Sequence, residues 1–242
     1  MSFTGPYRLY YWPQIQGRGE FVRLALEEAG APYVDVARRE GVAALTKILA
    51  DESLLEPPYA PPFLADGEVL IAQTANILSF IGRRHGLAPA AEAGAAFVNQ
   101  LQLTIADAVE EAHCVHHPIA ASLYFEDQKQ EAIRRAGFFR KERISKYLAY
   151  FEHVLAANPE GPHVLFGEEA TYADLSLFQL LEGLAFAFPR AMSSAAGRWP
   201  RTEALRIAIA DRPRIAAYLA SDRRIPFNNQ GIFRSYPELD GD

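Results

Sequence analysis

The stretch Tyr59-Ala60-Pro61-Pro62-Phe63-Leu64-Ala65-Asp66-Gly67 places two prolines directly before a short apolar run. Proline lacks the N–H that a strand needs for its hydrogen-bonded ladder, so a double proline is unusual at this point. A cis bond explains it, because X–Pro is the only peptide that adopts cis at a cost of about 0.5–1 kcal/mol. We therefore expect a cis bond before Pro62, which turns the backbone at Pro61 away from the sheet and leaves its carbonyl available to a ligand.

A polar pair, Gln73-Thr74, follows at the point where an expected strand gives way to an amphipathic helix. The first turn of a helix has unpaired backbone N–H groups and the positive end of the helix dipole, and a side-chain hydroxyl and amide add to them. Such a terminus binds carboxylates readily. Together with Pro61, the pair predicts a clamp for a peptide-like ligand that has a free carboxylate.

Composition is that of an ordinary globular protein, with 242 residues, 50% hydrophobic and 22% charged. The net charge of −6 is spread without long runs, which argues against nucleic-acid binding. No apolar stretch approaches the roughly 18 residues of a membrane span, and the first residues lack the pattern of a secretory signal. The single cysteine, Cys114, excludes an intramolecular disulfide. We expect a cytoplasmic protein that binds neither nucleic acid nor membrane.

The first third of the chain alternates strand and helix signals. The expected strands cover 7–12, 33–36, 63–64 and 69–71, the last two joined as a hairpin by a Gly turn. The expected helices run from 21 to Gly30, from 42 to 50, and from 75 to 85, where Gly86 ends the helix. This order predicts an α/β domain over residues 1–87.

Residues 88–94 are rich in Ala and Pro, and strand signals fade after them. Helices are expected over 97–115, 128–156, 172–188 and 202–220, with breaks or first-turn positions at Pro118, Pro159, Pro189, Pro200 and Pro213. Thr171 and Asp174 fit the capping box that begins a helix. We expect 88–94 to be a linker and 95–242 to be an all-helical domain.

Two segments near the N-terminus complete the pattern: Leu9-Tyr10-Tyr11-Trp12-Pro13, which indicates a strand ending in a loop, and Gly17-Arg18-Gly19-Glu20, which opens a helix. Together with the double proline and Gln73-Thr74, in the same order over nearly the whole chain, they resemble the glutathione transferase family. The resemblance is to tyrosine-type, cytosolic members of the bacterial or fungal kind. It implies a fold of α/β plus all-α class, with a thioredoxin-like N-terminal domain (βαβ-ββα) and a helical C-terminal domain.

The resemblance implies that Tyr11 is catalytic. A thiol with a pKa near 8.5 is mostly protonated at neutral pH, and a hydrogen-bond donor placed against the sulfur favours the reactive thiolate. Tyr10 and Tyr11 compete for this position, because side chains alternate faces along a strand and only one can face the ligand. The alignment of Tyr-Trp-Pro selects Tyr11. The alternative is that Tyr11 is simply a half-buried strand tyrosine.

The resemblance also implies a set of glutathione-binding residues, namely Trp12, Arg18, Lys47, Pro61, Gln73, Thr74 and Asp107. Lys47 would meet the glycyl carboxylate, and Asp107 would reach the amino group of glutathione bound to the other subunit of a homodimer. Three of them have alternatives: Trp12 in core packing, Arg18 as a solvated helix residue, and, for Asp107, the nearby rivals Glu110 and Glu111.

The electrophile pocket is expected to include His113, His117 and Tyr124, with Trp12 and the segment 225–229. Residues 113, 116 and 117 also have the spacing of metal ligands on a helix, but the family uses no metal, and we expect none. Polar packing before Pro118 is the remaining interpretation of the histidines. Cys114 is expected to be a small buried residue.

The residues and the resemblance together predict a homodimeric glutathione transferase, in which the glutathione thiolate attacks a small apolar electrophile. Glutathione is then a co-substrate, and isomerisation or dehalogenation would begin from the same thiolate. The alternative is a glutathione transferase-like binding or assembly module without turnover, because fold does not determine function. Thiol–disulfide reduction requires a cysteine at the first strand–helix junction, and residues 11–18 contain none.

Overall fold

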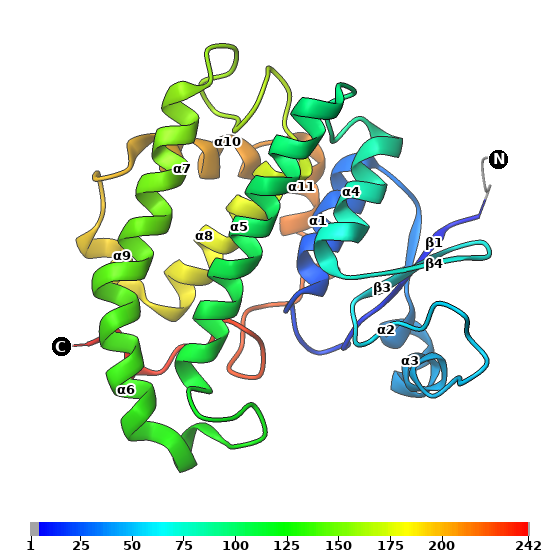
Figure 1. Ribbon diagram of the computed structural model, residues 1–242, viewed down its shortest axis with the longest axis horizontal. Helices are drawn as coiled ribbons and strands as arrows, with labels where there is room; N and C mark the ends of the chain where they lie inside the picture. The colour runs from blue at the N-terminus through cyan, green and yellow to red at the C-terminus, as the bar shows by residue number, and fades with distance from the viewer. Residues whose placement is uncertain (1–4, 242) are drawn as a thin grey trace.

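The computed structural model describes residues 5–241 (Figure 1). A four-stranded sheet of order β2-β1-β3-β4 forms its first part. The strands are β1 (Tyr7–Tyr10), β2 (Tyr33–Asp35), β3 (Phe63–Asp66) and β4 (Val69–Ala72). β1 pairs parallel with β2 and antiparallel with β3, and β3 pairs antiparallel with β4. This is the predicted thioredoxin-like order, βαβ followed by ββα.

Helices cover both faces of the sheet. α1 (Gly19–Ala29) and α4 (Thr74–His85) cover the face that presents Leu9 and Leu64, and this core continues into the helical part of the chain. α2 (Val36–Glu40) and α3 (Val42–Leu49) contribute to a smaller core with Tyr10. Of these four helices, α2 is the one not predicted from the sequence, because five residues are too few to show a helical period.

The rest of the described chain is helical, and its elements are α5 (Glu92–His116), α6 (Lys129–Phe138), α7 (Ser145–Ala157), α8 (Tyr172–Ala187), α9 (Pro189–Ser194), α10 (Pro200–Ala210), α11 (Pro213–Leu219) and α12 (Pro237–Asp240). A 3₁₀ turn (Phe125–Gln128) precedes α6, and a π-helical turn (Phe139–Ile144) joins α6 to α7. Between residues 5 and 241, no helix combines the length and the apolar character that a membrane span requires.

Several expected boundaries differ from the structure, among them the strand expected over 7–12, which ends at Tyr10, and the helix expected over 128–156, which divides into α6, the π-helical turn and α7. α5 begins at Glu92, inside the expected linker 88–94, where a carboxylate in the first turn favours helix formation. The expected helix 202–220 divides into α10 and α11, because Pro213 begins a new helix and cannot continue the previous one. The chain crosses from α4 to α5 through residues 86–91. The domain limits 1–87 and 95–242 stay a prediction.

The predicted capping box at the start of α8 is confirmed. The Thr171 hydroxyl accepts a hydrogen bond from the N–H of Ala173 at 3.3 Å, and the buried Asp174 carboxylate accepts one from the N–H of Thr171 at 2.7 Å. Burial raises the pKa of Asp174 to about 6. The next residue, Tyr172, donates its backbone N–H to Leu87 O at 2.9 Å, which ties α8 to the end of the α/β part.

Candidate functional site

Tyr11 lies directly after β1, with its ring packed on the loop that opens α1. Gly17 has a φ of +46°, and a Cβ there would collide with the Tyr11 hydroxyl. A Cβ at Gly19 would lie 2.5 Å from the Tyr11 ring, so the loop requires glycine at both positions. Between them, Arg18 donates its backbone N–H to Tyr11 Oη at 2.8 Å. Tyr10 belongs to the opposite side of the sheet and stacks on Phe63 at 4.7 Å, in agreement with the expected alternation.

The environment of Tyr11 keeps its phenol protonated. Burial raises the pKa of Tyr11, and this effect exceeds the opposing influence of the Arg18 N–H and of the positive charges on Arg18 and Arg23. Within residues 5–241, the hydroxyl accepts one hydrogen bond and has no acceptor for its own proton. Tyr11 is therefore a protonated donor at neutral pH, as stabilisation of a thiolate requires.

The start of α4 has two unusual features. Gln73 has a φ of 69°, the only positive φ of a non-glycine residue in the described part of the chain. Such backbone conformations cost on the order of 1–3 kcal/mol and cluster at functional sites. Thr74 follows as the first helical residue, and its buried Oγ1 has no hydrogen-bond partner among the described residues. The backbone N–H groups of the first turn also lack intrahelical partners. The terminus thus presents several unpaired donors at one place.

These residues line a hollow of about 450 Å³ between α4 and α5, and its lining consists of Arg18, Gln73, Thr74, Ala75, Asn76, Ser79, Asn99, Leu103 and Ala106. A smaller hollow of about 30 Å³ shares Arg18 and Thr74 with it and reaches Gln102. Gln102 is 1% exposed, and its Oε1 has no partner among the described residues. A guanidinium, a helix N-terminus and unpaired amide and hydroxyl groups together suit a ligand that has both a carboxylate and hydrogen-bond donors.

The predicted cis bond is present between Pro61 and Pro62. In the register of the sheet, Tyr10 lies opposite Phe63. Because β1 and β3 are antiparallel, Pro61 lies beside the end of β1, where Tyr11 leaves the sheet. The structure therefore brings two segments predicted to bind the ligand, 11–18 and 61–62, to one edge.

Three other predicted residues do not line the hollow beside Thr74. Trp12 is 38% exposed, Lys47 is exposed on α3, and Asp107 is exposed on α5. Gln102, Asn99, Asn76 and Ser79 line the hollows and were not singled out from the sequence. Gln102 and Asn99 come from α5, so their approach to Thr74 depends on tertiary packing. Asn76 and Ser79, one turn apart just after Thr74, gave a local signal.

The three histidines at the C-terminal end of α5, His113, His116 and the following residue His117, form a cluster with ring centroids 4.6–5.2 Å apart. His116 donates Nε2–H to Ile232 O at 2.8 Å, and His117 donates Nδ1–H to Leu123 O at 3.1 Å. Burial lowers the pKa of His113 to about 4 and that of His116 to about 3, so both are neutral at pH 7. The His116 bond attaches the C-terminal segment to α5, and the His117 bond holds the loop that follows α5. The electrophile pocket of His113, His117 and the 78% exposed Tyr124 stays a prediction.

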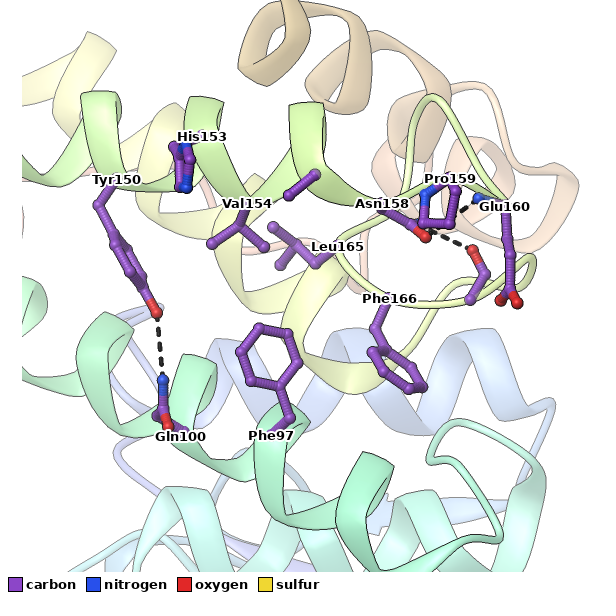
Figure 2. A pocket seen from close by; sticks show the side chains of 12 residues that line it. Phe97, Gln100, Tyr150, His153, Val154, Asn158, Pro159, Glu160, Leu165 and Phe166 are labelled. Atoms are coloured by element: carbon purple, nitrogen blue, oxygen red, sulfur yellow. Dashed lines mark hydrogen bonds between the residues drawn. The ribbon is translucent and has the colours of Figure 1, made fainter.

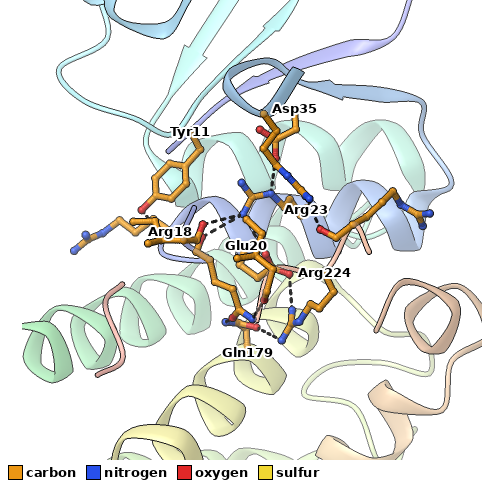
Figure 3. Close-up of polar contacts among 12 residues, drawn as sticks. Tyr11, Arg18, Glu20, Arg23, Asp35, Gln179 and Arg224 are labelled. Atoms are coloured by element: carbon orange, nitrogen blue, oxygen red, sulfur yellow. Dashed lines mark hydrogen bonds and ion pairs between the residues drawn. The ribbon is translucent and has the colours of Figure 1, made fainter. Parts of the chain in front are cut away.

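A buried ionic network holds the start of α1, as Figure 3 shows. Arg23 and Glu20 are both fully buried. Arg23 donates to Asp35 at 2.8 Å and to Glu20 at 3.1 Å. Glu20 also accepts hydrogen bonds from Tyr218 Oη at 2.7 Å and from Arg224 at 2.5 Å. The network joins α1 to β2, to α11 and to the C-terminal segment.

A chain of amides extends this network to the loop before α1. Arg224 donates to Gln179 Oε1 at 3.0 Å, and Gln179 donates to Gln16 Oε1 at 2.8 Å (Figure 3). Gln16 in turn donates to Ile225 O at 2.5 Å. Hydrogen bonds from α8 and to the C-terminal segment therefore hold the loop that packs on Tyr11.

The fold and the site define a class of protein: a thioredoxin-like sheet with a donor-rich helix N-terminus, followed by a helical domain. Residues 113–222 match the family described as glutathione S-transferase, C-terminal domain. Over 229 residues the chain is 27% identical to glutathione S-transferase P of Bos taurus, covering 93% of this chain and 98% of the relative. It is 24% identical over 231 residues to glutathione S-transferase of Dirofilaria immitis, with the same coverage.

A solved structure of a Pi-class glutathione S-transferase from Onchocerca volvulus has the same fold, with a TM-score of 0.72 and 22% identity over 96% of this chain and 99% of that chain. Prostaglandin synthase D of Nilaparvata lugens also has it, with a TM-score of 0.70 and 18% identity over 92% of this chain and 100% of that chain. Over nearly its whole length the chain is therefore similar to glutathione S-transferases, which are glutathione-dependent enzymes.

Proposed function

We propose that this protein is a cytoplasmic glutathione transferase that activates the glutathione thiol through Tyr11 and transfers it to a small apolar electrophile. One observation carries the proposal: the buried hydroxyl of Thr74, without a partner in the described chain, at a helix N-terminus that opens into a hollow. An unpaired buried polar group costs about 1–3 kcal/mol, which a bound carboxylate would recover. Glutathione has such carboxylates, and the named relatives are glutathione S-transferases.

In the proposed reaction, Thr74 and the free N–H groups of α4 hold a carboxylate of glutathione, and Arg18, which is ion-paired with Glu110, lines the same hollow. Tyr11 donates a hydrogen bond to the sulfur and so lowers the pKa of the thiol. The thiol proton leaves to solvent, and the thiolate sulfur forms a bond to the electrophilic carbon while the bond to the leaving group breaks, the leaving group departing with its electron pair. The proposed glutathione site also includes Trp12, Lys47, Pro61, Gln73 and Asp107. The proposed electrophile pocket includes His113, His117 and Tyr124.

Substituting Thr74 by Val keeps the shape of the side chain and removes only the hydroxyl. We expect glutathione to bind roughly 10- to 100-fold more weakly, because a hydrogen bond to a charged group contributes about 1.5–3 kcal/mol. Isothermal titration calorimetry with glutathione measures the effect. Thr74→Ser retains the hydroxyl and is the matched control, for which we expect nearly unchanged affinity. Equal affinity in the wild type and Thr74→Val would remove the main support for the site.

We also propose a homodimer, supported by two unpartnered apolar features. Leu55 is 97% exposed and Tyr59 is 94% exposed, both in the loop between α3 and β3. A pocket of about 520 Å³ lies between α5 and α7, and Figure 2 shows Phe97, Val154 and Leu165 turned into it. The loop and the pocket lie on distant parts of the chain (Figure 1). In a twofold dimer, the loop of each copy can insert into the pocket of the other copy.

Tyr59→Ala tests this assembly. We expect sedimentation equilibrium to show a shift toward monomer, because a buried aromatic anchor contributes about 2 kcal/mol or more to an interface. Ile119→Ala is the control, because it removes an apolar side chain that is 60% exposed but does not belong to this loop. It should leave the oligomeric state unchanged. A wild-type protein that is monomeric throughout the concentration range would contradict the proposal.

A further inference from the structure

Three side chains with different ligand chemistry lie together near the C-terminal end of α5. Glu110, His113 and Cys114 have the spacing i, i+3 and i+4, which places them on one face of the helix. One ligand atom from each, a carboxylate oxygen, an imidazole nitrogen and the sulfur, all lie within 4.8 Å of one another. The three histidines, whose spacing also fits metal ligands, are a different set, and the Nε2–H of His116 already donates to Ile232 O.

The existing contacts leave this set free to bind. The Cys114 thiol donates to Glu110 Oε1 at 3.2 Å, and Arg18 Nη2 donates to the other oxygen, Oε2, at 2.5 Å. The arginine therefore occupies only one side of the carboxylate, where it can orient the group as an outer partner of a metal ligand. Neither ring nitrogen of His113 has a hydrogen-bond partner within residues 5–241. All three side chains are at least partly exposed, so a cation can reach them from solvent.

We propose that Glu110, His113 and Cys114 bind one divalent cation of the Zn²⁺ type. A sulfur, a nitrogen and an oxygen ligand suit this borderline-soft ion, whereas Mg²⁺ and Ca²⁺ prefer oxygen alone. Three protein ligands leave the fourth tetrahedral position open to water or to a thiol from solution. Binding replaces the Cys114 proton, which is released to solvent.

The local charges support the proposal. Glu110 and the Cys114 thiolate supply two negative charges, and the negative end of the helix dipole lies in the same last turns of α5. The positive charges of three arginines disfavour a bound cation: Arg18 pairs with the Glu110 carboxylate, and Arg135 and Arg234 approach from neighbouring segments. The site is therefore expected to bind more weakly than a four-ligand structural zinc site. It does not depend on the proposed glutathione chemistry.

Titration of the glutathione-free protein with Co²⁺ tests the site, because a thiolate bound to Co²⁺ gives a charge-transfer absorption. Cys114 is the only cysteine of the chain, so the absorption has one possible protein source. We expect one Co²⁺ per chain, displaced by Zn²⁺, and complete loss of the absorption in Cys114→Ser. Glu110→Gln and His113→Ala should each weaken binding at least 10-fold, since even outer partners of a metal ligand contribute about 10- to 100-fold.

Glu111→Gln is the matched control. Glu111 is the next residue on the same helix, but its carboxylate accepts hydrogen bonds from Arg143 at 2.6 and 2.7 Å, away from the proposed set. We expect it to bind Co²⁺ as the wild type does, and circular dichroism verifies that each variant is folded. Three results would overturn the proposal: no absorption in the wild type, binding that persists in both Glu110→Gln and His113→Ala, or equal weakening in Glu111→Gln.

Discussion

We expect Tyr11→Phe to lower the rate of glutathione conjugation by about 10²- to 10³-fold, the loss that follows when one preorganised hydrogen-bond donor to an anion is removed. The substitution keeps the ring that packs on Gly17 and Gly19, so the loop that opens α1 retains its support. The substitution removes the hydrogen bond donated to the sulfur and the acceptor of the Arg18 backbone N–H. The measurement is kcat and kcat/KM with an aromatic electrophile at neutral pH, with glutathione saturating.

Tyr10→Phe is the control, because it removes the same hydroxyl one residue earlier, on the opposite side of the sheet. The Tyr10 hydroxyl accepts a hydrogen bond from Arg8 at 3.2 Å, outside the candidate site. We expect this variant to keep the wild-type rate. Full activity in Tyr11→Phe would remove Tyr11 from the mechanism. Glutathione binding without turnover in the wild type would favour a binding module.

We expect Glu20→Gln to lower the free energy of unfolding by about 3–5 kcal/mol, because one member of a buried ionic network is neutralised. Glu20 is fully buried and accepts hydrogen bonds from Arg23, Arg224 and Tyr218. Glutamine has nearly the same shape, so the loss reports the charge and not a cavity. Urea unfolding followed by circular dichroism measures the change in the free energy of unfolding.

Glu40→Gln makes the same chemical change in an exposed pair. Glu40 binds Arg8 at 2.9 Å, with 33% and 39% of the two side chains exposed. Solvent screens such a pair, and we expect a change of about 0–1 kcal/mol. If the two glutamate substitutions had equal effects, the buried network would not be what holds α1 and the C-terminal segment together.

The parts of the fold that the sequence predicted depend on local chemistry. Pro61-Pro62 indicated a cis bond, Gly30 and Gly86 indicated helix ends, and Thr171 with Asp174 indicated a cap. All of these features are in the structure. Each of these features is determined by residues that are close together in the sequence, so a local sequence pattern is sufficient to predict it. The short helix α2 had no such signal.

The parts of the site that the sequence missed depend on pairs far apart in the chain. Arg18 binds Glu110, 92 residues away, and Glu20 binds Arg224, 204 residues away. Gln102 meets the hollow at Thr74 only because α5 packs beside α4. No periodicity or motif links such pairs. The resemblance to a family supplied positions for Lys47 and Asp107, but these exposed side chains do not line the hollow beside Thr74.

The ultraviolet absorbance of the glutathione thiolate tests most directly whether this site binds and activates glutathione through Tyr11. Glutathione is added at neutral pH to the purified wild type and to Tyr11→Phe, and each difference spectrum is recorded against protein and glutathione alone. We predict a thiolate band with the wild type that disappears with the variant. No band with the folded wild type, or an equal band with Tyr11→Phe, would contradict the proposed role of Tyr11.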